Sequence, residues 1–151
     1  MAQQKEAIST INTLIETLKD GEKGFQEASE AVRDPQLKSL FQQYSQQRRR
    51  FATELQAQAQ NLGESKPAKS SSAAGAMHRA WINLKSAATS GDDKAILSEV
   101  ERGEDSAVHE YGEAMNDGLM GQAREIVSRQ FTEIKNTHDR VRQLRDAAKK
   151  R

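Results

Sequence analysis

Two glutamates, Glu22 and Glu104, occupy positions where a helical bundle normally places apolar side chains. They lie in two similar segments, 14–34 and 96–116, which align on their Gly-Glu pairs. In each segment the apolar residues recur at steps of three and four, which marks one face of an α-helix. A carboxylate on such a face is unfavourable unless it is paired or coordinates a metal. The two glutamates are therefore the first candidates for a buried ion pair or a metal site.

Two other helical segments also carry a charged or titratable residue on an otherwise apolar face. Arg48 lies on the inward face predicted for 35–62, and His138 lies on that predicted for 119–149. When these two faces are aligned, Arg48 corresponds to His138. We therefore expect a buried polar cluster across the bundle, provided that the helix stagger brings its members to one level. The expected members are Glu22, Arg48, Glu104 and His138.

This cluster has a structural and a metal-binding interpretation. In the first, Arg48 neutralises one glutamate through a bidentate pair and His138 hydrogen-bonds the other. In the second, Glu22, Glu104 and His138 hold a single transition metal, as two carboxylates and an imidazole can. A dinuclear site is the third alternative, but two divalent ions need several anionic oxygens, and a nearby guanidinium opposes them. The structural network is the preferred interpretation, because a buried charge that finds a protein partner needs no metal.

Several other residues could contribute chemistry but have a simpler role. Tyr44 and Tyr111 point inward by periodicity, and their hydroxyls could donate to the two carboxylates. Trp81 is expected to anchor the connection between the two halves against the bundle. His109 is expected at a partly solvated helix edge and His78 at the surface. The helix-interior glycines are expected to permit close packing beside the buried carboxylates.

Five helices should position these side chains. Their expected ranges are 3–33, 35–62, 74–89, 93–116 and 119–149. Asp34 is the N-cap of the second helix and Pro35 its first residue, and Gly63 is expected to end it. Residues 63–73, rich in Ser and Lys, form the one low-complexity linker.

The order of these elements predicts an all-α fold in one domain spanning residues 1–151. Residues 3–62 and 93–149 form two helical hairpins, joined by a connection over 63–92. A connection of roughly 30 residues is far longer than adjacent antiparallel helices need. It can run the length of the bundle and start the third long helix at the opposite end. This predicts a four-helix bundle with one long crossover that contains an additional short helix.

Composition excludes several other classes of protein. Hydrophobic residues make up 35% and charged residues 30%, and only two prolines and 5% aromatics occur, which argues against a β-rich fold. The net charge of +1 selects neither nucleic acid nor a membrane surface. The absence of cysteine excludes disulfides and thiolate zinc sites and suits a reducing cytosol. With neither a signal-like N-terminus nor a long apolar stretch, a cytoplasmic protein is expected.

Five stretches that cover nearly the whole chain carry a family resemblance. They are LIETLKDGEKGFQEA, DPQLKSLF, HRAWINLKSA, ERGEDSAVHEYGEAM and TEIKNTHDRVRQLRDA. Through them the chain resembles the ferritin-like superfamily, and most closely small bacterial four-helix-bundle proteins of a rubrerythrin-related family of unknown function. The resemblance implies a ferritin-like bundle and a bacterial stress-related setting, but no defined activity.

The resemblance also implies where a metal would bind. The superfamily builds a di-iron or di-manganese site from one Glu on each of two helices and a Glu-x-x-His pair on each of the other two. Glu22 and Glu104 match the single glutamates, and His138 matches one histidine. The positions that depart from the pattern are Ser45, Arg48 and Lys135. The pattern is thus half complete, and an arginine enters the layer.

The function expected from these observations is that of a non-enzymatic, stress-related or regulatory interaction protein whose metal site has degenerated. No cofactor is expected. The alternative is an oxidoreductase or storage protein that binds iron or manganese through Glu22, Glu104 and His138. An unknown protein partner or self-association as a dimer is left open, and neither a membrane nor a nucleic acid is expected as a partner.

Overall fold

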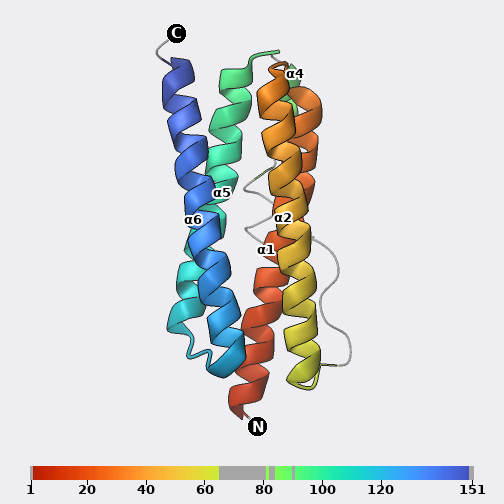
Figure 1. Ribbon diagram of the computed structural model, residues 1–151, viewed down its shortest axis with the longest axis vertical. Helices are drawn as coiled ribbons and strands as arrows, with labels where there is room; N and C mark the ends of the chain where they lie inside the picture. Colours follow the sequence, from red (N-terminus) through yellow and green to blue (C-terminus); the bar gives the residue numbers. More distant parts are fainter. Residues whose placement is uncertain (1, 65–80, 82–83, 90, 150–151) are drawn as a thin grey trace.

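The computed structural model describes residues 2–64, 81, 84–89 and 91–149. Within this part the chain forms helices and no strand, which confirms the all-α prediction. Four long helices pack side by side along one axis (Figure 1). The helices are α1 (Ala2–Ala31), α2 (Pro35–Asn61), the short α4 (Leu84–Thr89), α5 (Asp93–Asn116) and α6 (Gly121–Lys149). No helix among the described residues has the length and apolarity needed to span a bilayer.

Contacts at the two ends of the bundle establish how the helices run. The Asp93 carboxylate at the start of α5 accepts hydrogen bonds from the backbone N–H groups of Arg33 (2.9 Å) and Asp34 (3.1 Å) at the α1–α2 corner. At the opposite end, the Thr10 hydroxyl donates to Asp117 (3.4 Å), just after α5. Thus α1 and α5 are antiparallel, whereas α2 and α5 run in the same direction (Figure 1).

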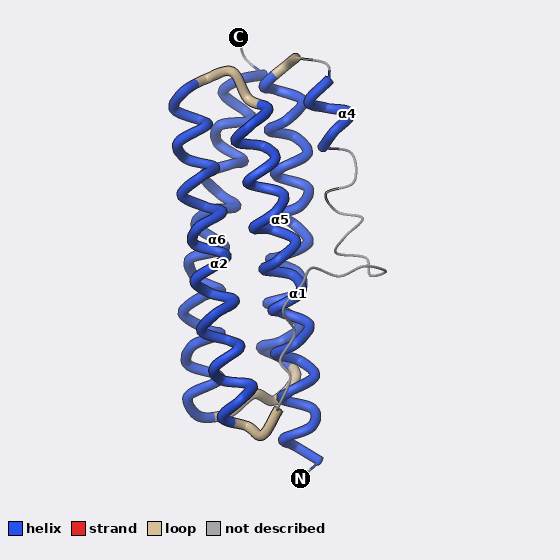
Figure 2. The backbone as a smooth tube through the Cα atoms, turned by 90° about the vertical axis from the view of Figure 1, so that its right-hand side faces the viewer, coloured by secondary structure: helices blue, strands red, loops and turns tan. Residues whose placement is uncertain are grey.

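The parallel course of α2 and α5 is the one-crossover topology expected from the sequence. The short helix α4 packs against α1 and α5, beside the bundle at the end where α5 begins (Figure 2). It occupies the last part of the helix expected over 74–89. The rest of that expected helix, and most of the crossover, lies outside the described residues.

Local sequence signals explain where the helices begin and end. Asp34 and Asp92 cap α2 and α5, and their carboxylates accept from the backbone N–H two residues later, at 2.8 and 2.9 Å. Gly63, with φ of 108°, follows the end of α2 as expected. The start of α6 is two residues later than expected, because Gly118 adopts φ of 82° and Gly121, where α6 begins, adopts φ of 61°, and both values lie outside the helical range.

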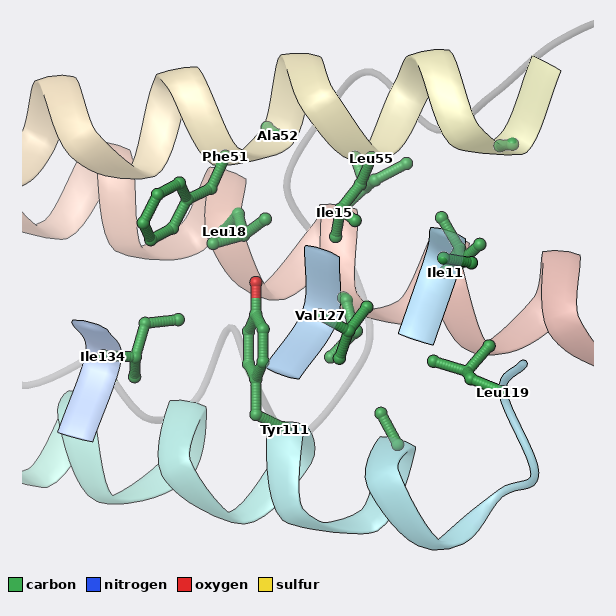
Figure 3. Close-up of a cluster of buried hydrophobic side chains, with 14 of the residues drawn as sticks. Ile11, Ile15, Leu18, Phe51, Ala52, Leu55, Tyr111, Leu119, Val127 and Ile134 are labelled. Carbon is green, nitrogen blue, oxygen red and sulfur yellow. The ribbon is translucent and has the colours of Figure 1, made fainter. Parts of the chain in front are cut away.

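The apolar core consists of two clusters, one in each half of the bundle. Figure 3 shows the first, in which Tyr111 points from α5 into the centre of the cluster. Along every long helix, one apolar cluster ends and the other begins around the charged or titratable residue noted in the sequence. These residues are Glu22, Arg48, Glu104 and His138. The flanking pairs are Leu18 and Phe25, Phe41 and Phe51, Val100 and Ala107, and Ile134 and Val141. The helix stagger therefore brings these positions to one level, which we call the polar layer.

Candidate functional site

The centre of the polar layer is an ion pair between Arg48 of α2 and Glu104 of α5. Arg48 Nη1 donates to Glu104 Oε1 at 2.7 Å and Nη2 donates to Oε2 at 2.6 Å. The two side chains are 1% and 0% exposed. The guanidinium also lies over the Phe25 ring, 5.2 Å from its centroid, in a cation–π contact. This geometry is the bidentate pair expected from the sequence, with Glu104 as the partner of Arg48.

Glu22 does not belong to the buried part of this layer, so the prediction of a buried carboxylate there is wrong. Its side chain is 26% exposed and pairs with Lys19 at 3.2 Å. The preceding residue, Gly21, faces inward, and a Cβ at Gly21 would lie 3.2 Å from Arg48 Nη1. Because the guanidinium needs this space, the helix turns the glycine toward it and the glutamate toward solvent.

His138 is buried in the layer as expected, but its partner is different. Its Nε2 contacts the Asp105 carboxylate, and its Nδ1 lies 3.3 Å from Asp139 Oδ1. The expected hydrogen bond to a glutamate of the layer is not formed, because Arg48 occupies both oxygens of Glu104. The expected ligands Glu22, Glu104 and His138 are thus directed toward three different partners.

A different group brings His138 together with carboxylates. Glu101 and Asp105, one turn apart on α5, offer oxygens that lie with a His138 nitrogen within 4.8 Å of one another. Glu101 is buried, and the guanidinium of Arg145 contacts it while Arg142 Nε lies 3.6 Å away. Sequence reasoning missed both carboxylates. The available signal was the spacing of four residues between Glu101 and Asp105, which places both on one face of a helix. His138 lies at the same level of the neighbouring helix α6.

The two tyrosines differ in their surroundings. Tyr111 is fully buried and donates to Gln130 Oε1 at 2.7 Å, so the expected bond to a glutamate is wrong. Gln130, which sequence reasoning also missed, donates in turn to the Phe51 carbonyl (3.3 Å) and to Glu54 (3.1 Å). Burial raises the pKa of Tyr111 well above its usual range, and the hydroxyl stays neutral. Tyr44 is half-buried with its ring edge against Phe25, and burial also raises its pKa.

Trp81 occupies a slot between α1 and α5, which confirms its expected role as an anchor. It is buried, and its ring centroid lies 5.4 Å from that of Phe25 in an edge-to-face arrangement. A Cβ built on either Gly24 or Gly103 would lie 2.3 Å from an indole atom. These two glycines therefore make room for the indole, whereas only Gly21 serves the buried ion pair.

His109 does not belong to the polar layer. His109 is exposed, 3.8 Å from Glu113 on the next turn of α5, in agreement with its expected place at a solvated edge. His78 lies outside the described residues.

Comparison with known proteins adds a family but no activity. No curated protein matches the chain. Residues 6–117 match the family model described as domain of unknown function DUF2383, and this match covers more than half of the 151 residues. The match includes Arg48 and Glu104 and ends before α6, which carries His138. The chain therefore belongs to the DUF2383 family, whose function is unknown.

Proposed function

We propose that this protein is a non-enzymatic bundle of the ferritin-like type, with a regulatory or interaction role, in which an ion pair replaces the metal centre. The observation that carries the proposal is the bidentate bond between Arg48 and Glu104 with both side chains buried. The guanidinium supplies the positive charge that a metal would otherwise bring to a buried carboxylate.

The other departures from the metal pattern have structural uses. The Ser45 hydroxyl donates to the Glu22 backbone carbonyl at 2.8 Å and so ties α2 to α1. Lys135 lies over the Phe131 ring, 4.3 Å from its centroid, at the solvent-exposed side of α6. Residues that stand where the superfamily has carboxylate ligands therefore serve packing, which supports a bundle without the superfamily's dinuclear centre.

The alternative is an iron or manganese oxidoreductase or storage protein that uses Glu22, Glu104 and His138. It would require Arg48 to release both oxygens of Glu104 and α1 to rotate Glu22 inward. Moving the guanidinium away from Glu104 without a replacement leaves two buried charges unpaired, which is strongly unfavourable. No contact among the described residues favours this arrangement over the ion pair.

The proposed interaction role requires a surface that contacts a partner. The stress-related setting rests on the family resemblance, and the partner is either another protein or a second copy of the chain. Among the large hydrophobic side chains of the described residues, Met120 alone is exposed, whereas Met115 and Ile126 are half-buried against the core. Because no large apolar patch is exposed there, the described surface suits a polar contact better than an obligate apolar interface.

Metal analysis combined with an iron-oxidation assay tests the proposal. Untagged protein purified without chelator is compared with a Glu104→Gln variant, which keeps the size of the side chain, and with Glu22→Gln, which removes the half-buried carboxylate that the alternative would also use as a ligand. We expect metal content to be the same in all three proteins and iron oxidation to stay at background. Bound iron or manganese that disappears in Glu104→Gln, with helicity retained by circular dichroism, would overturn the proposal.

A further inference from the structure

We propose that Glu101, Asp105 and His138 bind one divalent transition-metal ion at the flank of the bundle between α5 and α6. This site is separate from the Arg48–Glu104 pair and uses neither of its residues. It goes beyond the proposed function, because a metal at the flank requires no metal at the bundle axis.

The positions of the ligand atoms carry this inference. One oxygen from each carboxylate and a nitrogen of His138 lie within 4.8 Å of one another. Atoms that share a metal at about 2.1 Å are roughly 3.5 Å apart. The three groups therefore reach a common ion through small side-chain rotations, with no movement of α5 or α6.

The surroundings of His138 also suit a metal ligand. Its Nε2 faces Asp105, and its Nδ1 lies 3.3 Å from the Asp139 carboxylate. A carboxylate on the second ring nitrogen fixes the orientation and the tautomer of a metal-bound imidazole. His138 is buried, whereas the Asp105 side chain is 60% exposed, so an ion could enter from solvent on the Asp105 side.

Two arginine side chains, Arg142 and Arg145, balance the charge on Glu101. Glu101 is buried, and the Arg145 guanidinium forms an ion pair with its Oε2. Arg142 Nε lies 3.6 Å from the other oxygen, with its side chain 53% exposed. The Arg145 side chain is 24% exposed and also pairs with Asp146 at 2.9 Å. In this proposal both arginines compete with a bound cation for Glu101.

The ligand chemistry narrows the choice of metal. An imidazole nitrogen with two carboxylate oxygens suits zinc, iron(II), manganese(II) or cobalt(II), whereas magnesium and calcium prefer oxygen ligands alone. Three protein ligands leave at least one coordination position for water.

Calorimetric titration of untagged, full-length protein with Zn²⁺ tests the site, and Co²⁺ titration followed by visible absorption gives a second readout. We expect one ion per chain. Asp105→Asn removes an exposed ligand without opening the core, and it should weaken binding by about tenfold or more. Arg145→Ala removes a competitor for Glu101 and should tighten binding.

The chain provides two matched controls. His109 and Glu113 form an exposed histidine–carboxylate pair on α5, and no third ligand group joins them among the described residues, so Glu113→Gln should leave zinc affinity unchanged. Glu104→Gln tests the axial pair and should also leave it unchanged, so that this inference and the proposed function fail independently. Wild-type protein that binds no zinc, or an affinity that Asp105→Asn does not change, would overturn the inference.

Discussion

Glu104 and Asp105 are neighbours on α5 and have the same charge, but they lie in opposite environments. Glu104 is 0% exposed and gives both oxygens to Arg48 of α2. Asp105 is 60% exposed and contacts His138 of α6. An α-helix turns by about 100° per residue, so adjacent positions face different neighbours. The comparison shows that two neighbouring carboxylates on one helix can differ completely in burial and in partner.

The arginines that pair with these two groups of carboxylates also differ in burial. Arg48 is enclosed by Glu104, Phe25 and the inward face of Gly21, and its side chain is 1% exposed. Arg142 and Arg145 contact Glu101 with side chains that are 53% and 24% exposed, so water can solvate them when they move. We therefore expect the Arg48–Glu104 pair to be structural. At the flank we expect the arginines that pair with Glu101 to be replaceable by a metal ion.

The largest expected effect comes from breaking the interior pair. Arg48→Ala leaves Glu104 buried without its partner, and we expect the free energy of unfolding to fall by about 3–5 kcal/mol. Urea unfolding followed by circular dichroism measures this loss. The flank counterpart, Arg142→Ala, removes a half-exposed charge and should change stability by less than about 1 kcal/mol.

The double variant Arg48→Met/Glu104→Leu tests whether the loss comes from an unpaired charge. Replacing both partners by apolar side chains of similar volume leaves no buried charge, so stability should return close to the wild-type value. If Arg48→Ala and Arg142→Ala lost the same free energy, the distinction between interior and flank would not hold.

A smaller effect is expected at the Trp81 slot, which tests how closely the interior is packed. Gly24→Ala or Gly103→Ala places a methyl group 2.3 Å from the indole, and we expect a loss of about 1–3 kcal/mol together with a shift in fluorescence of the single tryptophan. Gly112→Ala is the control, since its Cβ would meet Phe131 at an ordinary 3.8 Å. That variant should be neutral or slightly more stable, because alanine favours the helix.

Much of the fold could be predicted from the sequence, because the signals for it are local. Capping aspartates, the Asp34-Pro35 corner and Gly63 mark helix ends through contacts within a few residues. The crossover follows from the length of the connection. The position of the polar residue along each helix follows from the spacing of the apolar residues around it, whereas the stagger that brings the four positions to one level is seen only in the structure.

The rotation of individual helices could not be predicted in the same way. From Leu18 to Phe25, steps of three and four residues can pass through either Gly21 or Glu22, and both satisfy a helical face. The choice is made by the Arg48 side chain, which needs the space beside a glycine. Likewise, the contact of Asp105 with His138 depends on how α5 and α6 face each other.

Tyr111→Phe tests the hydrogen bonding of the interior away from the ion pair. The change leaves Gln130 Oε1 without the donor that lies at 2.7 Å, and we expect a loss of about 1–2 kcal/mol at pH 8 in urea unfolding. Glu54→Gln is the milder comparison, because Glu54 is partly exposed and its amide replacement can still accept from Gln130.

The Tyr111→Phe variant should also change how the free energy of unfolding depends on pH in the alkaline range. Burial raises the pKa of Tyr111 above the ordinary value of about 10, so the unfolded chain loses this proton at lower pH than the native chain. The stabilising contribution of the neutral hydroxyl to the free energy of unfolding is fully present below about pH 10 and declines as the pH rises further. The stability difference between wild type and Tyr111→Phe should therefore narrow by roughly 1 kcal/mol from pH 8 to pH 11. A constant difference would contradict this assignment.

The smallest effect is expected for Glu22→Ala, and it tests the comparison most directly. Glu22 and Glu104 follow equivalent glycines in similar segments, and the sequence alone predicts that both are buried. With its side chain 26% exposed and its partner Lys19 on the same helix, Glu22 should contribute less than about 0.5 kcal/mol. Urea unfolding at low and high salt measures this, and salt should remove most of the difference because the pair is screened by ions. A loss as large as that of Arg48→Ala would mean that Glu22 shares the guanidinium with Glu104, and the division between a fixed interior and an exchangeable surface would then fail on α1.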